Sequence, residues 1–198
     1  MPVNRGIPDV AQKRKDWNGL ISGFKASDLV FLDESGCNTD MTRRYAYSLG
    51  GSRSVDSAPL SKPKNTTILS SIQLDGTLRY TTFSGGTTVE RFKRYLETDL
   101  LPHLNGNSVL IMDDMKSHHA KAVRNLLDNS GVRYIYLPPY SPDLNPIEKL
   151  WSKVKSFLRK FKARTLDALP NAIQCAFQIV SPSDCSGWFH SCGYSPYF

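Results

Sequence analysis

The chain has 198 residues, 40% of them hydrophobic and 11% aromatic, which is enough for one packed domain and too few for two large ones. Lys and Arg number 25 against 18 Asp and Glu, and the resulting charge of +7 permits a polyanionic partner without identifying one. The sequence shows no apolar run of roughly 18 residues, no signal peptide, and neither zinc-ligand nor disulfide-framework spacing among its four cysteines. Composition therefore excludes an integral membrane protein and a disulfide-stapled secreted domain, and we expect a soluble, cytoplasmic protein.

The N-terminal residues predict a short helix. Residues 9–24 have a rough apolar face and several basic side chains, a pattern typical of an amphipathic helix. We expect residues 1–25 to form a basic helix or linker and residues 26–198 to form the main domain.

The next segment predicts a strand followed by a long polar connection. Leu29–Asp33 is an apolar run that ends in an acid. Residues 34–65 are rich in Ser, Gly, Arg and Pro, with a possible short strand at 45–47. A connection of this length in a compact domain indicates a functional loop, and we interpret it as an insertion or clamp.

The remaining elements predict an α/β domain. Two β-rich runs, 66–74 and 77–83, meet at Asp75-Gly76, a strong hairpin signal. Further strands are expected at 109–112 and 133–137, and helices at 87–104, 118–129, 146–161, 166–180 and 182–190. Strands that alternate with helices pair in parallel, whereas the hairpin is antiparallel. We therefore predict a mixed five-stranded sheet flanked by helices, in the order of a ribonuclease H-like fold.

Three carboxylates stand next to predicted strands. Asp33 and Asp113 each follow an apolar strand, and Glu148 lies in the first turn of the helix that follows the last strand. If the strands bearing Asp33 and Asp113 are neighbours, both acids emerge at the same edge of the sheet, where sites form in α/β folds.

Each acid also has a structural interpretation. Asp33 could close a turn, and the Asp113–Asp114 region could cap the next helix. The run 145–148, Asn-Pro-Ile-Glu, resembles a capping box in which Glu148 would bond to the backbone. The residues alone leave these alternatives open.

Taken together, the acids favour a metal site for phosphodiester chemistry. Adjacent carboxylates such as Asp113 and Asp114 repel unless a cation or proton intervenes, and hard oxygen ligands suit Mg²⁺ or Mn²⁺. Two such ions bridged by carboxylates suit cleavage of a phosphodiester. No Gly-rich phosphate loop is present. For His118 and His119 we favour a phosphate contact or a structural role over metal ligation, and we assign Trp151 to the core.

Three segments resemble the catalytic domain of Tc/mariner superfamily transposases, most closely the bacterial insertion sequence 630 type. These are LVFLDESG at 29–36, VLIMDDMKSHH at 109–119 and YLPPYSPDLNPIEKLWSKVK at 136–155. The third is highly specific, and 34 residues separate Asp113 from Glu148, as in the family's DD(34)E pattern. The resemblance spans residues 10–195, because the ending SPSDCSGWFHSCGY also looks like this branch.

The resemblance implies a ribonuclease H-like DDE endonuclease that performs cut-and-paste DNA transposition, by hydrolysis at the element ends and strand transfer into target DNA. It implies that Asp33, Asp113 and Glu148 are the catalytic and metal-binding residues of a two-metal Mg²⁺ or Mn²⁺ site. Asp114, where the family usually has Asn, and His118, which matches a family histidine, become secondary candidates. The loop at 34–65 occupies the place of a clamp that contacts the second subunit of a homodimer on DNA.

The family's N-terminal helix-turn-helix region is expected to be missing, so that a separately encoded or frameshifted partner would supply it. We expect the chain to act on transposon-end and target DNA, at the nucleoid of a prokaryotic cytoplasm. Contacts to phosphates are expected from basic residues: Arg43, Arg44, Lys62, Lys64, Lys153 and Lys155, with Arg53, Arg159 and Lys160 as further positions. The alternatives are a structure-directed nuclease acting on RNA–DNA hybrids, and a non-catalytic remnant that binds DNA or dimerises.

Overall fold

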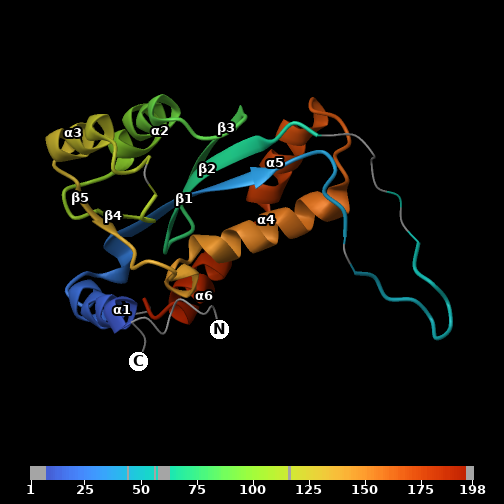
Figure 1. Cartoon of the computed structure of the whole chain (residues 1–198), viewed down its shortest axis with the longest axis horizontal. Coiled ribbons are helices and arrows are strands. Elements are labelled where there is room, and N and C mark those ends of the chain that lie inside the picture. The colour runs from blue at the N-terminus through green and yellow to red at the C-terminus, as the bar shows by residue number, and fades with distance from the viewer. Residues whose placement is uncertain (1–7, 44, 56, 58–62, 116, 195–198) are drawn as a thin grey trace.

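The protein folds around one mixed sheet with helices on both faces (Figure 1). The computed structural model describes residues 8–43, 45–55, 57, 63–115 and 117–194. The strands are β1 (Leu29–Cys37), β2 (Thr66–Gln73), β3 (Leu78–Ser84), β4 (Val109–Met112) and β5 (Arg133–Tyr136). The α-helices are α1 (Pro8–Ile21), α2 (Val89–Tyr95), α3 (Lys121–Ser130), α4 (Ile147–Phe161), α5 (Ala168–Gln178) and α6 (Pro182–Ser191). The strand order is β3-β2-β1-β4-β5, which confirms the predicted five-stranded mixed sheet.

The central strand β1 has a different kind of partner on each side. It pairs antiparallel with β2 along nearly its whole length, and in parallel with β4 only from Leu29 to Leu32. β4 in turn pairs in parallel with β5. The hairpin between β2 and β3 turns at Gly76, where φ is +91° and a Cβ would lie 2.9 Å from the Cα of Pro182, so only glycine fits.

The side chains of β1 point alternately into two separate hydrophobic cores. Phe31 belongs to the core shared with α1, α4, α5 and α6, whereas Val30 and Leu32 belong to the core under α2 and α3. All three side chains are fully or almost fully buried. The fold is thus three-layered, and each β1 residue faces a helix layer that its position determines.

Three element predictions differ from the structure. The first strand does not end at Asp33 but continues to Cys37, because β2 offers a full-length antiparallel partner to the polar residues that follow. The strand expected at 45–47 is absent, and these residues lie in an extended exposed loop. The helix expected over 87–104 is divided into α2, a π-helical turn (Leu96–Leu100) and a 3₁₀ turn (Leu101–His103).

Helix α1 packs against the C-terminal part of the chain. Trp17 is buried and donates from Nε1 to the Tyr194 hydroxyl at 3.1 Å. Arg14 forms an ion pair with Asp143 at 2.7 Å. The predicted basic helix is therefore docked on the fold rather than extended away from it.

The connection between β1 and β2 projects away from the body of the molecule (Figure 1). Tyr45, Tyr47, Leu49 and Val55 are each more than four-fifths exposed there. No helix among the described residues has the length and apolarity needed to cross a membrane. All four cysteines are free thiols, as expected.

Candidate active site

A cavity of about 400 Å³ opens where β1, β4 and the start of α4 meet. Asp33, Asp113 and Glu148 all line it, facing the proline-rich segment 138–142. A larger cavity of about 700 Å³ lies beside α1, but none of its described lining residues is acidic. The structure therefore brings the three predicted acids to one cavity, and this cavity is the candidate site.

Asp33 is held in place by the strand and by α4. Its position two residues after Phe31 turns it to the α4 side of the sheet, and it is only 7% exposed. Trp151 Nε1 donates to Asp33 Oδ2 at 3.0 Å, and the Glu34 amide donates to Oδ1 at 2.7 Å. Trp151 is in the core, as expected, but its ring nitrogen also has a role that the sequence did not indicate.

Burial raises the pKa of Asp33 to about 7, although the hydrogen bonds from Trp151 and the Glu34 amide act against the rise. The charges of Asp113 and Glu148 raise this pKa further. Glu148 stands at the cavity mouth, and partial desolvation raises its pKa; Lys155 lowers it and Asp113 raises it. The negative charges of the carboxylates therefore repel one another, and a bound cation would reduce that repulsion.

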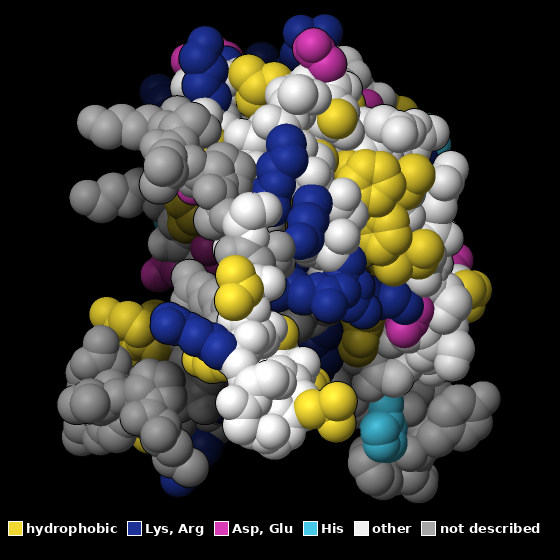
Figure 2. All heavy atoms as spheres, turned by 90° about the vertical axis from the view of Figure 1, so that its right-hand side faces the viewer, with side chains coloured by type: hydrophobic (Ala, Val, Ile, Leu, Met, Phe, Trp, Pro, Cys, Tyr) yellow, Lys and Arg dark blue, Asp and Glu magenta, His cyan; other side chains and the backbone are white. Residues whose placement is uncertain are grey.

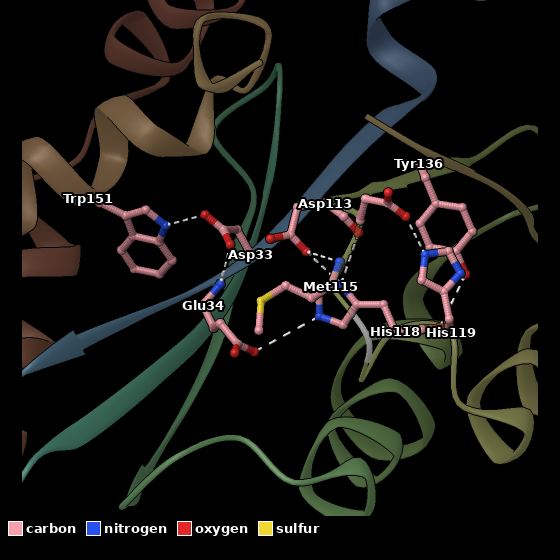
Figure 3. A network of polar contacts seen from close by, with 9 residues as sticks. Asp33, Glu34, Asp113, Met115, His118, His119, Tyr136 and Trp151 are labelled. Atoms are coloured by element: carbon pink, nitrogen blue, oxygen red, sulfur yellow. Dashed lines mark hydrogen bonds and ion pairs between the residues drawn. The ribbon is translucent and has the colours of Figure 1, made fainter. Parts of the chain in front are cut away.

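The adjacent acids Asp113 and Asp114 point to different histidines (Figure 3). His118 Nδ1 lies 2.8 Å from Asp113 Oδ1, and His119 Nε2 lies 2.5 Å from Asp114 Oδ1. Burial lowers the pKa of His118, but the hydrogen bond and charge of Asp113, with the charge of Glu34, outweigh this and raise it overall. Asp113 and Asp114 thus both border the cavity, but each is paired with its own histidine.

The predicted capping box at the start of α4 is not formed. Pro146 occupies the N-cap position, and α4 has no side-chain cap. Asn145 is instead buried, and the Glu148 amide bonds to its backbone carbonyl at 3.1 Å. The Glu148 carboxylate is therefore not used as a cap and lines the cavity.

The donor set suits a divalent cation. Three carboxylates supply hard oxygen ligands, and burial, with a smaller contribution from the neighbouring carboxylates, raises the pKa of both Asp33 and Glu148. Within the described chain, no three His, Cys, Asp or Glu side chains are already grouped closely enough to hold an ion.

A sequence model of the DDE superfamily endonucleases matches residues 28–170, which contain all three acids. The chain belongs to the DDE superfamily endonuclease family. It is also similar to the Tc1 transposase of Caenorhabditis elegans, with 28% identity over 97 residues, 47% of this chain and 36% of that protein. The family membership predicted from the three motifs is thus confirmed.

Solved structures of the Mos1 transposase share the fold. The pre-cleavage Mos1 transpososome has a TM-score of 0.79 at 19% identity and covers 93% of this chain and 59% of that one. The Mos1 catalytic domain with raltegravir and Mg has a TM-score of 0.69 at 16% identity, covering 92% and 89%. The predicted ribonuclease H-like fold is confirmed. This DDE endonuclease chain spans about a third of the Tc1 transposase and less than two thirds of the Mos1 chain.

The basic residues predicted to contact DNA that the structure describes lie on two different elements, the connection after β1 and helix α4. Arg44 and Lys62 lie outside the described residues, and Arg43 and Lys64 are exposed in the projecting connection. Lys153 forms an ion pair with Asp184 of α6 at 2.5 Å. Of the four that the structure describes, Lys155 is the one whose charge acts on a site carboxylate, Glu148.

A basic band crosses one face of this family member (Figure 2). The face lies on the right-hand side of Figure 1, where α4 ends. Lys155 and Arg159 line a polar cavity of about 370 Å³ there, next to Asn38 and Thr42 at the end of β1. This surface begins about two helical turns from Glu148, roughly 10 Å along α4.

Sequence reasoning missed two residues of the site. Glu34 follows Asp33 and faces the opposite helix layer, where its carboxylate approaches His118. Asn145 is 4% exposed, and its Oδ1 has no hydrogen-bond partner in the described structure. The alternation of β1 could have predicted the direction of Glu34, but only if the strand had been extended past Asp33.

Proposed function

We propose that this chain is the catalytic domain of a DDE transposase, which hydrolyses DNA at the ends of a transposable element and transfers the ends into target DNA. The observation that carries the proposal is the cavity that Asp33, Asp113 and Glu148 share in a DDE superfamily endonuclease. The proposed catalytic domain covers residues 26–198, with α1 docked on it.

In the proposed reaction a water or a DNA 3′-hydroxyl attacks the phosphorus in line, and the bond from phosphorus to the 3′ oxygen of the leaving strand breaks. Asp33, Asp113 and Glu148 would hold Mg²⁺ or Mn²⁺, and two such ions would supply the charge that assists attack and stabilises the leaving oxygen. Solved Mos1 paired-end complexes are described with Mn and with Mg. Buried Asp33 is held by Trp151, whereas Glu148 is exposed and lines the same cavity.

The test is cleavage by the purified chain. We expect Mn²⁺ to support nicking of duplex DNA and joining of a 3′ end to plasmid DNA, with no reaction in EDTA. An RNA–DNA hybrid of the same sequence is the comparison substrate. Preferential cleavage of the hybrid would favour a hybrid-directed nuclease, and DNA binding without cleavage would favour a non-catalytic remnant.

Of the proposed DNA contacts, Lys155 is best supported, because it lies on the same face of α4 as Glu148 and lines a polar cavity with Arg159. We expect Lys155→Gln to reduce the slope of log K against log salt for duplex DNA by about 0.9, the loss of one phosphate contact. Gel shifts without divalent metal measure binding apart from catalysis.

Lys93→Gln is the matched control, because Lys93 lies on α2, on the opposite face of the sheet, and pairs with Glu97. An unchanged slope for Lys155→Gln, or an equal change for Lys93→Gln, would count against this contact. Arg43, Arg44, Lys62, Lys64 and Lys153 remain proposed contacts, although the ion pair of Lys153 makes it less available.

We also propose that the chain acts as a homodimer on paired transposon ends, with the projecting connection as the clamp. Its exposed Tyr45, Tyr47 and Leu49 are suited to burial against a second copy. The mass of the protein–DNA complex in solution tests this proposal. A helix-turn-helix region, supplied by a longer form or a partner, would recognise the ends, and the protein would act on DNA in the cytoplasm.

A further inference from the structure

His118 is a buried histidine next to the candidate site. It follows β4 in the turn after Asp113, and its side chain is 0% exposed. The ring stacks on Phe92 of α2, with centroids 4.3 Å apart and planes inclined by 22°. A polar ring held this tightly inside an apolar layer needs hydrogen-bond partners for its nitrogens.

A carboxylate lies on each side of this ring (Figure 3). Nδ1 is 2.8 Å from Asp113 Oδ1 and 3.2 Å from the Asp113 carbonyl oxygen. Nε2 lies 4.0 Å from Glu34 Oε2, and neither of these two buried atoms has a hydrogen-bond partner in the described structure. The ring is therefore hydrogen-bonded to Asp113 through Nδ1, while Nε2, on its other edge, lies near the Glu34 carboxylate.

The neighbouring histidine does the same for the other acid of the pair. His119 bonds to Asp114, its ring lies 4.2 Å from the Tyr136 ring, and Arg124 Nε donates to its carbonyl at 2.8 Å. Without separate partners, adjacent carboxylates would repel each other within one turn. The two histidines therefore give Asp113 and Asp114 separate hydrogen-bond partners, although both acids line the cavity.

We propose that His118 is a positioning residue for the DDE site: through the Nδ1 hydrogen bond it fixes the direction of the Asp113 carboxylate, so that Asp113 can bind a divalent cation with Asp33 and Glu148. Among the described residues, the hydrogen bonds to Asp113 reach Oδ1 and the backbone carbonyl, and none of them engages Oδ2. His118 acts through Asp113 and does not itself touch the reacting atoms. This inference rests on the proposed function, since it takes Asp113 as a cation ligand.

Three substitutions of His118 distinguish a hydrogen-bond donor to Asp113 from a side chain that only fills space in the core. His118→Asn places an amide nitrogen near the position of Nδ1 and keeps the donor toward Asp113. His118→Gln carries its amide toward the position of Nε2, and His118→Leu keeps bulk without a donor. Removing the partner of a metal ligand typically weakens metal affinity about 10–100-fold.

The first measurement is Mn²⁺ affinity of the whole chain without DNA, from the electron paramagnetic resonance signal of free Mn²⁺. We expect affinity within about threefold of wild type for His118→Asn, and a 10–100-fold loss for His118→Gln and His118→Leu. The same order is expected in the Mn²⁺ concentration that half-saturates nicking. Melting temperatures identify variants that fold, and His103→Asn, at an exposed histidine that does not line the cavity, is the control that should leave Mn²⁺ affinity near wild type.

Folded Gln and Leu variants that bind Mn²⁺ like wild type would overturn the proposal, as would an Asn variant as weak as the Leu variant. Crystal structures of the variants give a readout that does not need metal. We expect the Asp113 carboxylate to turn in His118→Leu and to stay in place in His118→Asn; an unmoved carboxylate in His118→Leu overturns the inference. If wild type binds Mn²⁺ through Asp113 yet cuts no DNA, the proposed function fails while the positioning role stands.

Discussion

Asp33→Asn, Asp113→Asn and Glu148→Gln are each expected to abolish Mn²⁺-dependent nicking, with a rate loss of at least about 10³-fold. Each amide keeps the shape of the side chain but removes the negative charge that a cation requires. The three residues act as one unit, so a double variant should be little worse than a single one. The measurement is single-turnover nicking of a supercoiled plasmid, with circular dichroism to show that the fold is intact.

Asp114→Asn is the control that tests whether Asp113, rather than its neighbour Asp114, is the catalytic acid. Asp114 borders the same cavity, but its carboxylate is bonded to His119 rather than directed with Asp33 and Asp113. We expect a loss of about tenfold or less. Nicking at a wild-type rate by any of the three amide variants would remove that residue from the catalytic assignment, and a larger loss in Asp114→Asn than in Asp113→Asn would reverse the choice between the two.

Asp33→Asn is also expected to stabilise the metal-free protein at alkaline pH. Burial raises the pKa of Asp33 from 3.8 to about 7, so between these values the folded chain holds a proton that the unfolded chain has lost. The free energy of unfolding therefore falls as pH rises through this range and levels off above about pH 7. For a pKa difference of this size, the contribution of Asp33 to the free energy of unfolding is about 4 kcal/mol lower at pH 8 than at pH 3.

The measurement is urea unfolding of wild type and Asp33→Asn in EDTA between pH 4 and pH 8. The advantage of the variant should grow with pH, whereas the same change at exposed Asp16 should show no such trend. Adding Mn²⁺ at pH 8 should stabilise wild type and not Asp33→Asn, because a bound cation offsets the buried charge. A pH-independent difference between wild type and the variant would contradict the shifted pKa.

Apolar runs and turn residues were sufficient to predict most of the fold. The run Val109–Met112 was predicted with its observed bounds, and Asp75-Gly76 correctly marked the hairpin. The end of β1 was placed too early because Asp33, Glu34 and Ser35 are polar, and a polar run gives no local strand signal. Pairing with β2, which lies some 30 residues further along the chain, stabilises this part of the strand.

The members of the candidate site were predictable, but the contacts that direct them were not. The spacing of the motifs selected Asp33, Asp113 and Glu148, and all three line the cavity. The Trp151 hydrogen bond to Asp33 joins residues 118 positions apart, and the environment of His118 depends on Phe92 in another element. Such contacts follow from tertiary packing, which no local pattern encodes. The predicted capping box also did not form, because the helix begins one residue later, with Pro146 rather than Asn145 at the N-cap.

Because β1 pairs with β4 over a short length only, the backbones that carry Asp33 and Asp113 are held in different ways. Beyond Leu32 and Met112 the strands separate, and β1 runs on alongside β2 while the chain after β4 turns into the loop that carries both histidines. Asp33 therefore sits on backbone that a sheet ladder holds rigid, whereas Asp113 sits on backbone held by side chains. A cation bound between them would therefore contact one carboxylate held by the sheet, Asp33, and one whose direction depends on a side-chain hydrogen bond, Asp113.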